Sequence, residues 1–207
     1  MKKRSANKRK RIIVGVTGSL ASGKTTVSGI LAAHLNAKIL DADKIARLLI
    51  QPFSPVFPKL VACFGEEIIS KSEGIDSNKL SELAFADDAS VKKLNSITHP
   101  YIIALIKKGI RQNRRRNIIV DAPLLFEAGL DKYMDCSIVV KTAPAVRNKR
   151  LKKKFGSRYL AVLKRSRFQM PIEKKISLAD FIIDNSKTLK ETKKQVQMIG
   201  RSLRFKE

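Results

Sequence analysis

Residues Gly18 to Thr25 read Gly-Ser-Leu-Ala-Ser-Gly-Lys-Thr, a complete match to the phosphate-binding pattern G-x-x-x-x-G-K-[ST]. In such a loop the backbone N–H groups point at a bound anion, and the helix that follows adds its positive N-terminal dipole. Lys24 can reach the β- and γ-phosphates of a nucleotide, and the Thr25 hydroxyl can ligate Mg²⁺. The pattern therefore predicts a nucleotide-phosphate site made by Gly18, Ser19, Leu20, Ala21, Ser22, Gly23, Lys24, Thr25 and Thr26.

Acidic side chains follow two further apolar runs. Asp41 and Asp43 come after Ala37-Lys38-Ile39-Leu40, and Asp121 comes after Asn117-Ile118-Ile119-Val120. Ligands of open α/β sheets bind at the carboxyl ends of the strands, so these positions favour a functional role. Asp121 is predicted to complete the Mg²⁺ environment, and a carboxylate at Asp41 or Asp43 could orient and deprotonate an attacking hydroxyl. Either of the latter two could instead cap the next helix.

A strongly basic segment, residues 144–169, is predicted to be a helical lid. It contains ten of the chain's cations, among them Arg150, Lys154 and Arg165. Cations brought over a phosphoryl-transfer site stabilise the charge of the transition state and exclude water. A nucleic-acid-binding face is the rival interpretation, but only three aromatic residues interleave the cations, so a base-stacking platform is weakly supported.

The elements that must position these residues alternate between strand and helix. Strands are expected at Arg11–Thr17, 37–40, 117–120, 137–140 and 181–183, and helices at Thr25–Leu35 and Leu189–Leu203. This alternation predicts an α/β fold with a doubly wound parallel sheet of five strands. We divide the chain into a basic tail (1–11), a nucleotide-binding core (12–58, 117–143 and 170–207), a helical insert (59–116) and the lid (144–169). Within the insert we expect a turn at Ser72-Glu73-Gly74 and a helix break at His99-Pro100.

Composition limits the alternatives. The 207 residues carry a net charge of +25, and seven of the 43 basic residues lie within residues 2–11. The rest of the chain is still basic, which suits a polyanionic partner or a multiply phosphorylated substrate. Cys63 and Cys136 have no disulfide or metal spacing, so we expect two reduced thiols in a cytoplasmic protein. No apolar run is long enough to span a membrane, and the basic N-terminus is not followed by the apolar region of a signal peptide.

Several motifs together resemble one family, the dephospho-CoA kinases, over residues 12 to about 200. Besides the phosphate loop, the matching pieces are Asp41-Ala42-Asp43 with Ala46-Arg47, Phe64-Gly65, Leu94 to Pro100, Asp121 to Leu130, Arg150-Leu151, Arg165 with Gln169, and Ala179-Asp180 through Asn185. The run Asp121-Ala122-Pro123-Leu124-Leu125-Phe126-Glu127 is the most specific piece, because no general constraint of a phosphate loop requires it.

The resemblance implies a sheet of the P-loop kinase type, with the helical insert holding the CoA moiety. It implies transfer of the ATP γ-phosphate, with Mg²⁺, to the ribose 3′-hydroxyl of dephospho-CoA, the last step of coenzyme A biosynthesis. Asp43, Lys24 and Arg150 would be catalytic, and Arg150 and Arg165 would contact phosphates of ATP. Acceptor-binding residues would be Asp43, Arg47, His99, Leu124 and Glu127. His99 could also serve only to fix a turn before Pro100.

Departures from the family pattern occur in the phosphate loop and in the lid. Ser19 and Ala21 stand where the family usually has glycine, and a positive φ at either position would strain the loop by about 1 kcal/mol or more. Lys154 stands where Arg is common, which would replace a bidentate phosphate contact by a point charge.

Two other functions stay open. The nearer rival is another small-molecule kinase of the same fold, acting on a nucleoside or nucleotide. The rival of a different class is a nucleic-acid-binding ATPase, which the net charge of +25 motivates. We expect dephospho-CoA as the small-molecule partner, with no specific nucleic acid and no membrane, and the sequence leaves the oligomeric state open.

Overall fold

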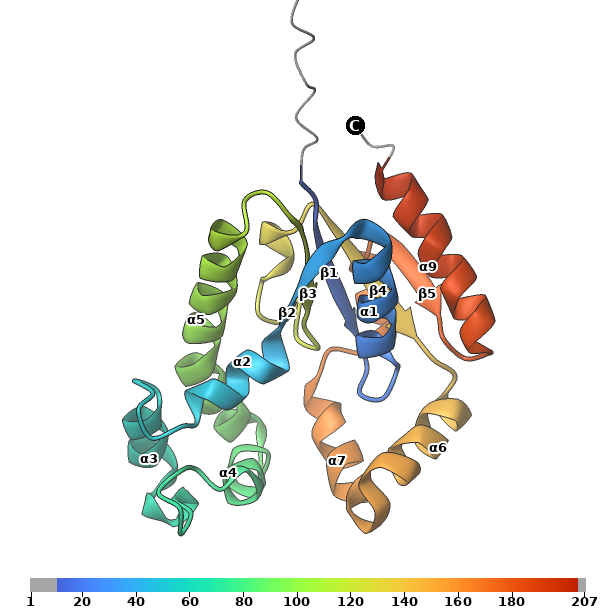
Figure 1. The fold of residues 1–207 in the computed structure, drawn as a ribbon. Coiled ribbons are helices and arrows are strands. Elements are labelled where there is room, and N and C mark those ends of the chain that lie inside the picture. The colour runs from blue at the N-terminus through green and yellow to red at the C-terminus, as the bar shows by residue number, and fades with distance from the viewer. Residues whose placement is uncertain (1–10, 205–207) are drawn as a thin grey trace, which may run out of the picture.

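The computed structural model describes residues 11–204, except for the side chains of residues 161 and 164. The predicted basic tail therefore lies outside the described residues, apart from Arg11. Within them five parallel strands form one sheet in the order β2-β3-β1-β4-β5 (Figure 1). The strands are β1 (Ile13–Gly18), β2 (Ala37–Asp41), β3 (Asn117–Asp121), β4 (Cys136–Lys141) and β5 (Phe181–Asp184). The predicted five-stranded parallel sheet is confirmed.

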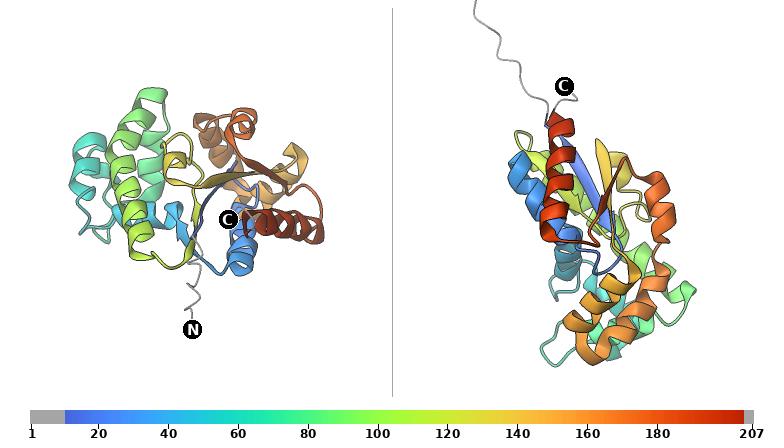
Figure 2. Two further views of the ribbon diagram at one scale, coloured as in Figure 1. Left: turned by 90° about the horizontal axis from the view of Figure 1, so that it is seen from above. Right: turned by 90° about the vertical axis from the view of Figure 1, so that its right-hand side faces the viewer.

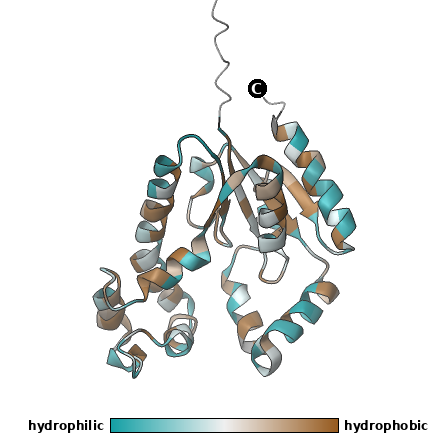
Figure 3. Cartoon of the chain, in the orientation of Figure 1, coloured by the Kyte–Doolittle hydropathy of each residue, from teal (hydrophilic) through white to brown (hydrophobic). Residues whose placement is uncertain are grey.

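Helices cover both faces of the sheet, as a doubly wound fold requires (Figure 2). α1 (Lys24–Leu35) and α9 (Leu189–Arg204) bury one face, where Leu31 and Val196 pack with Ile119 of β3. On the other face α5 (Asp88–Gln112) packs Ile106 against Ile118 of β3. Ile118 and Ile119 point to opposite faces because successive side chains of a strand alternate. Both faces are therefore apolar, and Figure 3 shows the contrast with the hydrophilic residues along the solvent side of α9.

Two lobes lie beyond the carboxyl ends of the strands. One lobe contains α2 (Ala42–Leu49), α3 (Phe57–Phe64), α4 (Ser77–Ala84) and the N-terminal half of α5, and it has its own apolar cluster around Leu60 and Leu80. The other contains α6 (Pro144–Phe155) and α7 (Tyr159–Arg165), after which α8 (Ile172–Leu178) leads back to β5. Short 3₁₀ turns complete the chain at Glu66–Ile68, Asp131–Tyr133, Gly156–Arg158 and Ser166–Phe168. The predicted turn is present, with Glu73 at φ 64°.

The expected helix break at His99-Pro100 is wrong. α5 runs without interruption from Asp88 to Gln112 with Pro100 inside it. A proline in a helix interior removes one backbone hydrogen bond and costs about 3 kcal/mol. The cost is offset because both halves of α5 are anchored: Val91 and Ile106 are buried, and the Asp87 side chain caps the N-terminus by accepting from the Ser90 N–H at 2.7 Å.

No helix among residues 11–204 is long and apolar enough to cross a membrane. Cys63 is half-buried and Cys136 is buried in β4, and the two are not joined by a disulfide.

Candidate active site

The phosphate loop connects β1 to α1, as its strand and helix context predicts. Gly18 and Gly23 have φ values of 150° and 92°, a region that favours glycine. A Cβ atom on Gly18 would lie 2.3 Å from the Val140 carbonyl oxygen, and one on Gly23 would lie 2.0 Å from Nδ2 of Asn185. Both glycines of the motif are therefore required by close packing as well as by backbone conformation.

Ala21 is the strained residue of the loop. Its φ is 60°, in the left-handed region where a side chain costs about 1–2 kcal/mol, whereas Ser19 is not among the residues with positive φ. Ser19 therefore replaces a glycine without backbone strain, whereas Ala21 carries the predicted strain.

Lys24 begins α1 and turns back over the loop. Its ammonium donates to the carbonyl oxygens of Gly18 at 3.0 Å and Ser19 at 3.2 Å, and the residue is only 8% exposed. Burial lowers the pKa of Lys24, and the carboxylates of Asp121 and Asp43 oppose that shift. The ammonium therefore lies at the phosphate loop, under the influence of two carboxylates, where it can bind an anion.

Three side chains from outside the phosphate loop hold it in place by donating hydrogen bonds to one of its carbonyl groups. The Ser22 carbonyl accepts from Thr142 Oγ1 at 2.9 Å, from Asn185 Nδ2 at 2.8 Å and from Arg150 Nη1 at 3.4 Å. Arg150 also donates to the Asn185 carbonyl at 3.0 Å. The predicted catalytic residue Arg150 therefore lies at the phosphate loop. The role of Thr142 was missed, because a lone threonine 120 residues along the chain gives no sequence signal.

Asp41 and Asp43 have different roles. Asp41 is the N-cap of α2, its side chain accepting from the Lys44 N–H at 3.0 Å, which is the capping alternative. Asp43, in the first turn of α2, lines the large cavity described below. Burial raises the pKa of Asp43, and the Lys24 ammonium opposes the rise. Of the two acids, Asp43 is the one that lines the cavity.

Asp121 ends β3 directly opposite Asp41 of β2 in the sheet register. It is 5% exposed and accepts a hydrogen bond from Ser28 Oγ at 3.1 Å. Burial raises the pKa of its carboxyl, with Lys24 acting against the shift. Thr25 is exposed in the first turn of α1. A hydroxyl and a carboxylate are the oxygen ligands that Mg²⁺ uses beside phosphates and water, so this donor set fits the predicted ion.

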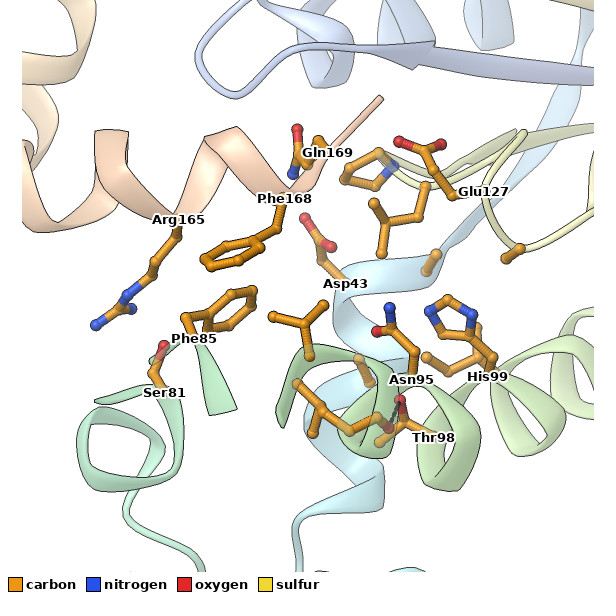
Figure 4. A pocket seen from close by; sticks show the side chains of 18 of the residues that line it. Asp43, Ser81, Phe85, Asn95, Thr98, His99, Glu127, Arg165, Phe168 and Gln169 are labelled. Atoms are coloured by element: carbon orange, nitrogen blue, oxygen red, sulfur yellow. Dashed lines mark hydrogen bonds between the residues drawn. The ribbon is translucent and has the colours of Figure 1, made fainter. Parts of the chain in front are cut away.

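A cavity of about 410 Å³ opens beside the phosphate loop, between the two lobes (Figure 4). All five predicted acceptor-binding residues line it: Asp43, Arg47, His99, Leu124 and Glu127. Arg165 lines it as well, beside Phe85, whereas Arg150 contacts the phosphate loop. The structure therefore brings the predicted acceptor residues together in one cavity.

His99 lies in the middle of α5 and faces this cavity, so it does not fix a turn. Burial lowers the pKa of its imidazole, and the Glu127 carboxylate opposes the shift. A neutral imidazole on a cavity wall can donate or accept a hydrogen bond.

Glu127 is tied to a lysine that sequence reasoning missed. Lys175 of α8 is 1% exposed, and its ammonium lies 2.8 Å from Oε1 of Glu127 and 2.5 Å from the Pro123 carbonyl oxygen. The same Oε1 accepts from the Met170 N–H at 2.9 Å. This pair joins the segment that follows the lid to the cavity wall. Lys175 stands in the run Glu173-Lys174-Lys175, and the sequence gives no sign that its ammonium is buried while that of a neighbouring lysine is solvated.

A phosphate loop on a parallel five-stranded sheet, with a basic helical lobe and a cavity that contains Asp43 and Glu127 beside it, defines the class of P-loop kinases. The family model described as dephospho-CoA kinase matches residues 12–191. The chain belongs to the dephospho-CoA kinase family.

Individual relatives agree with this assignment. The dephospho-CoA kinase of Carboxydothermus hydrogenoformans is 38% identical over 198 residues, covering 94% of this chain and 96% of the relative. The solved dephospho-CoA kinase of Campylobacter jejuni superposes with a TM-score of 0.64 at 29% identity, covering 92% of this chain and 96% of its own. TT1252 from Thermus thermophilus superposes with a TM-score of 0.78 at 26% identity, covering 93% and 97%.

Proposed function

We propose that this chain transfers the γ-phosphate of ATP to the ribose 3′-hydroxyl of dephospho-CoA, giving CoA and ADP, the last step of coenzyme A biosynthesis. Family membership supports the reaction. The observation that carries it in this molecule is Asp43, which lines the acceptor cavity and lies within electrostatic reach of Lys24 of the phosphate loop. Asp43 therefore connects the cavity with the phosphate loop.

The chemistry divides among a few side chains. Asp43 accepts the proton of the 3′-hydroxyl as that oxygen attacks the γ-phosphorus. The bond between the γ-phosphorus and the bridging oxygen breaks, and the electron pair leaves with ADP. Lys24 and the backbone N–H groups of residues 18–26 hold the phosphates in line. Thr25 and Asp121 would hold Mg²⁺, which supplies positive charge to the phosphate oxygens when bound.

The basic lobe 144–169 acts as the lid in this proposal. Arg150 already contacts the phosphate loop, and Arg165 contacts the opposite lobe. Burial is the main influence on the pKa of Lys24 and of Asp43, but the Lys154 ammonium of α6 also affects both. This lid cation is therefore within electrostatic reach of the reacting groups. The two cysteines, which are not joined by a disulfide, agree with the cytoplasm as the place of the reaction.

A coupled assay of ADP release tests the proposal against its rivals. The protein is incubated with ATP and Mg²⁺ and with dephospho-CoA, a panel of nucleosides and nucleotides, or DNA and RNA. Turnover that depends on dephospho-CoA is expected. Turnover with nucleosides alone would assign the chain to another small-molecule kinase. Hydrolysis stimulated by nucleic acid would favour the ATPase that the net charge of +25 suggests.

A further inference from the structure

Two phenylalanine rings meet at one end of the acceptor cavity. Phe85 is the C-cap of α4, and Phe168 is the last residue of the turn Ser166–Phe168 at the end of the lid. Their ring centroids are 5.8 Å apart and their planes are inclined by 45°. Both residues line the cavity and both are only half-buried (Figure 4). The pair therefore bridges the two lobes at this end of the cavity, and each ring stays partly exposed.

Guanidinium groups lie beside both rings. Arg167 is 4.6 Å from the centroid of the Phe168 ring. The Arg165 guanidinium lies 6.0 Å from the centroid of the Phe85 ring. A guanidinium stacks on aromatic faces and stays charged at every physiological pH. This end of the cavity thus offers flat surfaces flanked by two cations and suits a planar, electron-rich ligand group.

The opposite end of the cavity has a different character. Asn95, His99 and Glu127 lie there, and Asp43 lies between them and the phenylalanine pair (Figure 4). An acceptor whose ribose hydroxyl meets Asp43 must extend both ways from that point, because the base leaves from one side of the ribose and the pantetheine arm from the other. The amide of Asn95 and the imidazole of His99 can form hydrogen bonds with the amides of the pantetheine arm, whereas aromatic faces can stack on the base.

We propose that Phe85 and Phe168 form the subsite for the adenine ring of the acceptor nucleotide. This inference rests on the proposed function. A base stacked between the two rings needs a centroid separation of about 7 Å, twice the contact distance of carbon atoms, against the 5.8 Å observed. Because the rings belong to different lobes, the bound base holds the end of the lid against the insert.

Loss of one aromatic face should weaken acceptor binding selectively. Stacking of a base on an aromatic side chain is worth about 10- to 100-fold in affinity. Phe168→Leu is therefore expected to raise the KM for dephospho-CoA by about that factor, while the KM for ATP stays unchanged. Phe85→Leu should act in the same direction. Phe53→Leu is the matched control, because Phe53 is 83% exposed and does not line the cavity.

A fluorescent reporter separates stacking from a loss of folding. The chain has no tryptophan, so Phe168→Trp places a single indole in the subsite, and Phe53→Trp provides the control. Dephospho-CoA should quench the indole at position 168 saturably, whereas pantetheine and ATP should not. Neither ligand class should affect position 53.

Several results would overturn the inference. Quenching by pantetheine alone would assign this end of the cavity to the arm, and quenching by ATP alone would assign it to the phosphate donor. A KM for dephospho-CoA within twofold of the parent value in Phe168→Leu would also refute it. Failure of the parent protein to phosphorylate dephospho-CoA would refute the proposed function instead, so the two failures are distinguishable.

Discussion

Removal of the buried Lys175 ammonium is expected to destabilise the fold strongly. Lys175→Met keeps the length of the side chain but deletes its ion pair with Glu127 and its hydrogen bond to the Pro123 carbonyl. Breaking one partner of a buried ion pair costs about 3–5 kcal/mol. The lower end of that range applies here, because Glu127 Oε1 still accepts from the Met170 N–H and the Pro123 carbonyl still accepts from Thr17 Oγ1.

The Tm measured by circular dichroism should fall accordingly. For a chain of this size about 3 kcal/mol corresponds to a decrease of about 6–12 °C. The double variant Lys175→Met/Glu127→Gln should recover most of the loss, because neither partner is then left as an unpaired buried charge. Lys187→Met is the matched control. Its pair with Glu191 is largely exposed, and its loss should leave the Tm unchanged.

Two outcomes would contradict this reasoning. If Lys175→Met shifts the Tm no more than Lys187→Met, the buried pair contributes nothing to the fold. If the losses of the two single variants simply add in the double variant, Lys175 and Glu127 do not interact.

Three further predictions concern Asp43, Ala21 and His99. Asp43→Asn should lower kcat by about a hundredfold or more. Because burial raises the pKa of Asp43, the parent's kcat/KM should start to fall with decreasing pH at a higher pH than an ordinary carboxylate would give, and the variant should lack this limb; near-normal turnover would remove its role as base. Ala21→Gly should raise the free energy of unfolding by about 0.5–1 kcal/mol in urea titrations, because it relieves the φ of 60°; a destabilised variant would show that no strain is stored there. The pKa of His99 is lowered by burial, so the unfolded chain binds the proton more readily, and stability is present above the unfolded pKa and lost as pH falls. In urea titrations, the free energy of unfolding should fall more between pH 8 and pH 5 in the parent than in His99→Gln. An equal decrease in the two proteins would contradict the assignment.

Local patterns predicted most of the fold. The apolar runs before Gly18, Asp41 and Asp121 form the strands β1, β2 and β3, because strand–loop–helix order and β-branched residues are properties of short segments. The strand and helix on either side of the phosphate loop followed from the same kind of signal. The break expected at Pro100 was wrong, because packing of α5 against two apolar clusters outweighs a local preference.

The sequence predicted those site residues that belong to recognisable motifs. All five predicted acceptor residues line one cavity. The sequence left the choice between Asp41 and Asp43 open, and in the structure Asp41 caps α2 by accepting from the Lys44 N–H. Thr142 and Lys175 were missed because their partners, Ser22 and Glu127, lie 120 and 48 positions away in the chain. No short segment of sequence contains such a contact, because only the folded sheet brings these residues together.

The most direct test of the central claim follows the phosphate itself. The protein is mixed with dephospho-CoA and ATP labelled in the γ-phosphate, and the labelled product is separated and identified. Label in the 3′-phosphate of CoA, with its formation slowed about a hundredfold or more in Asp43→Asn, is the predicted result. Label found only in free phosphate or in another acceptor would contradict the account.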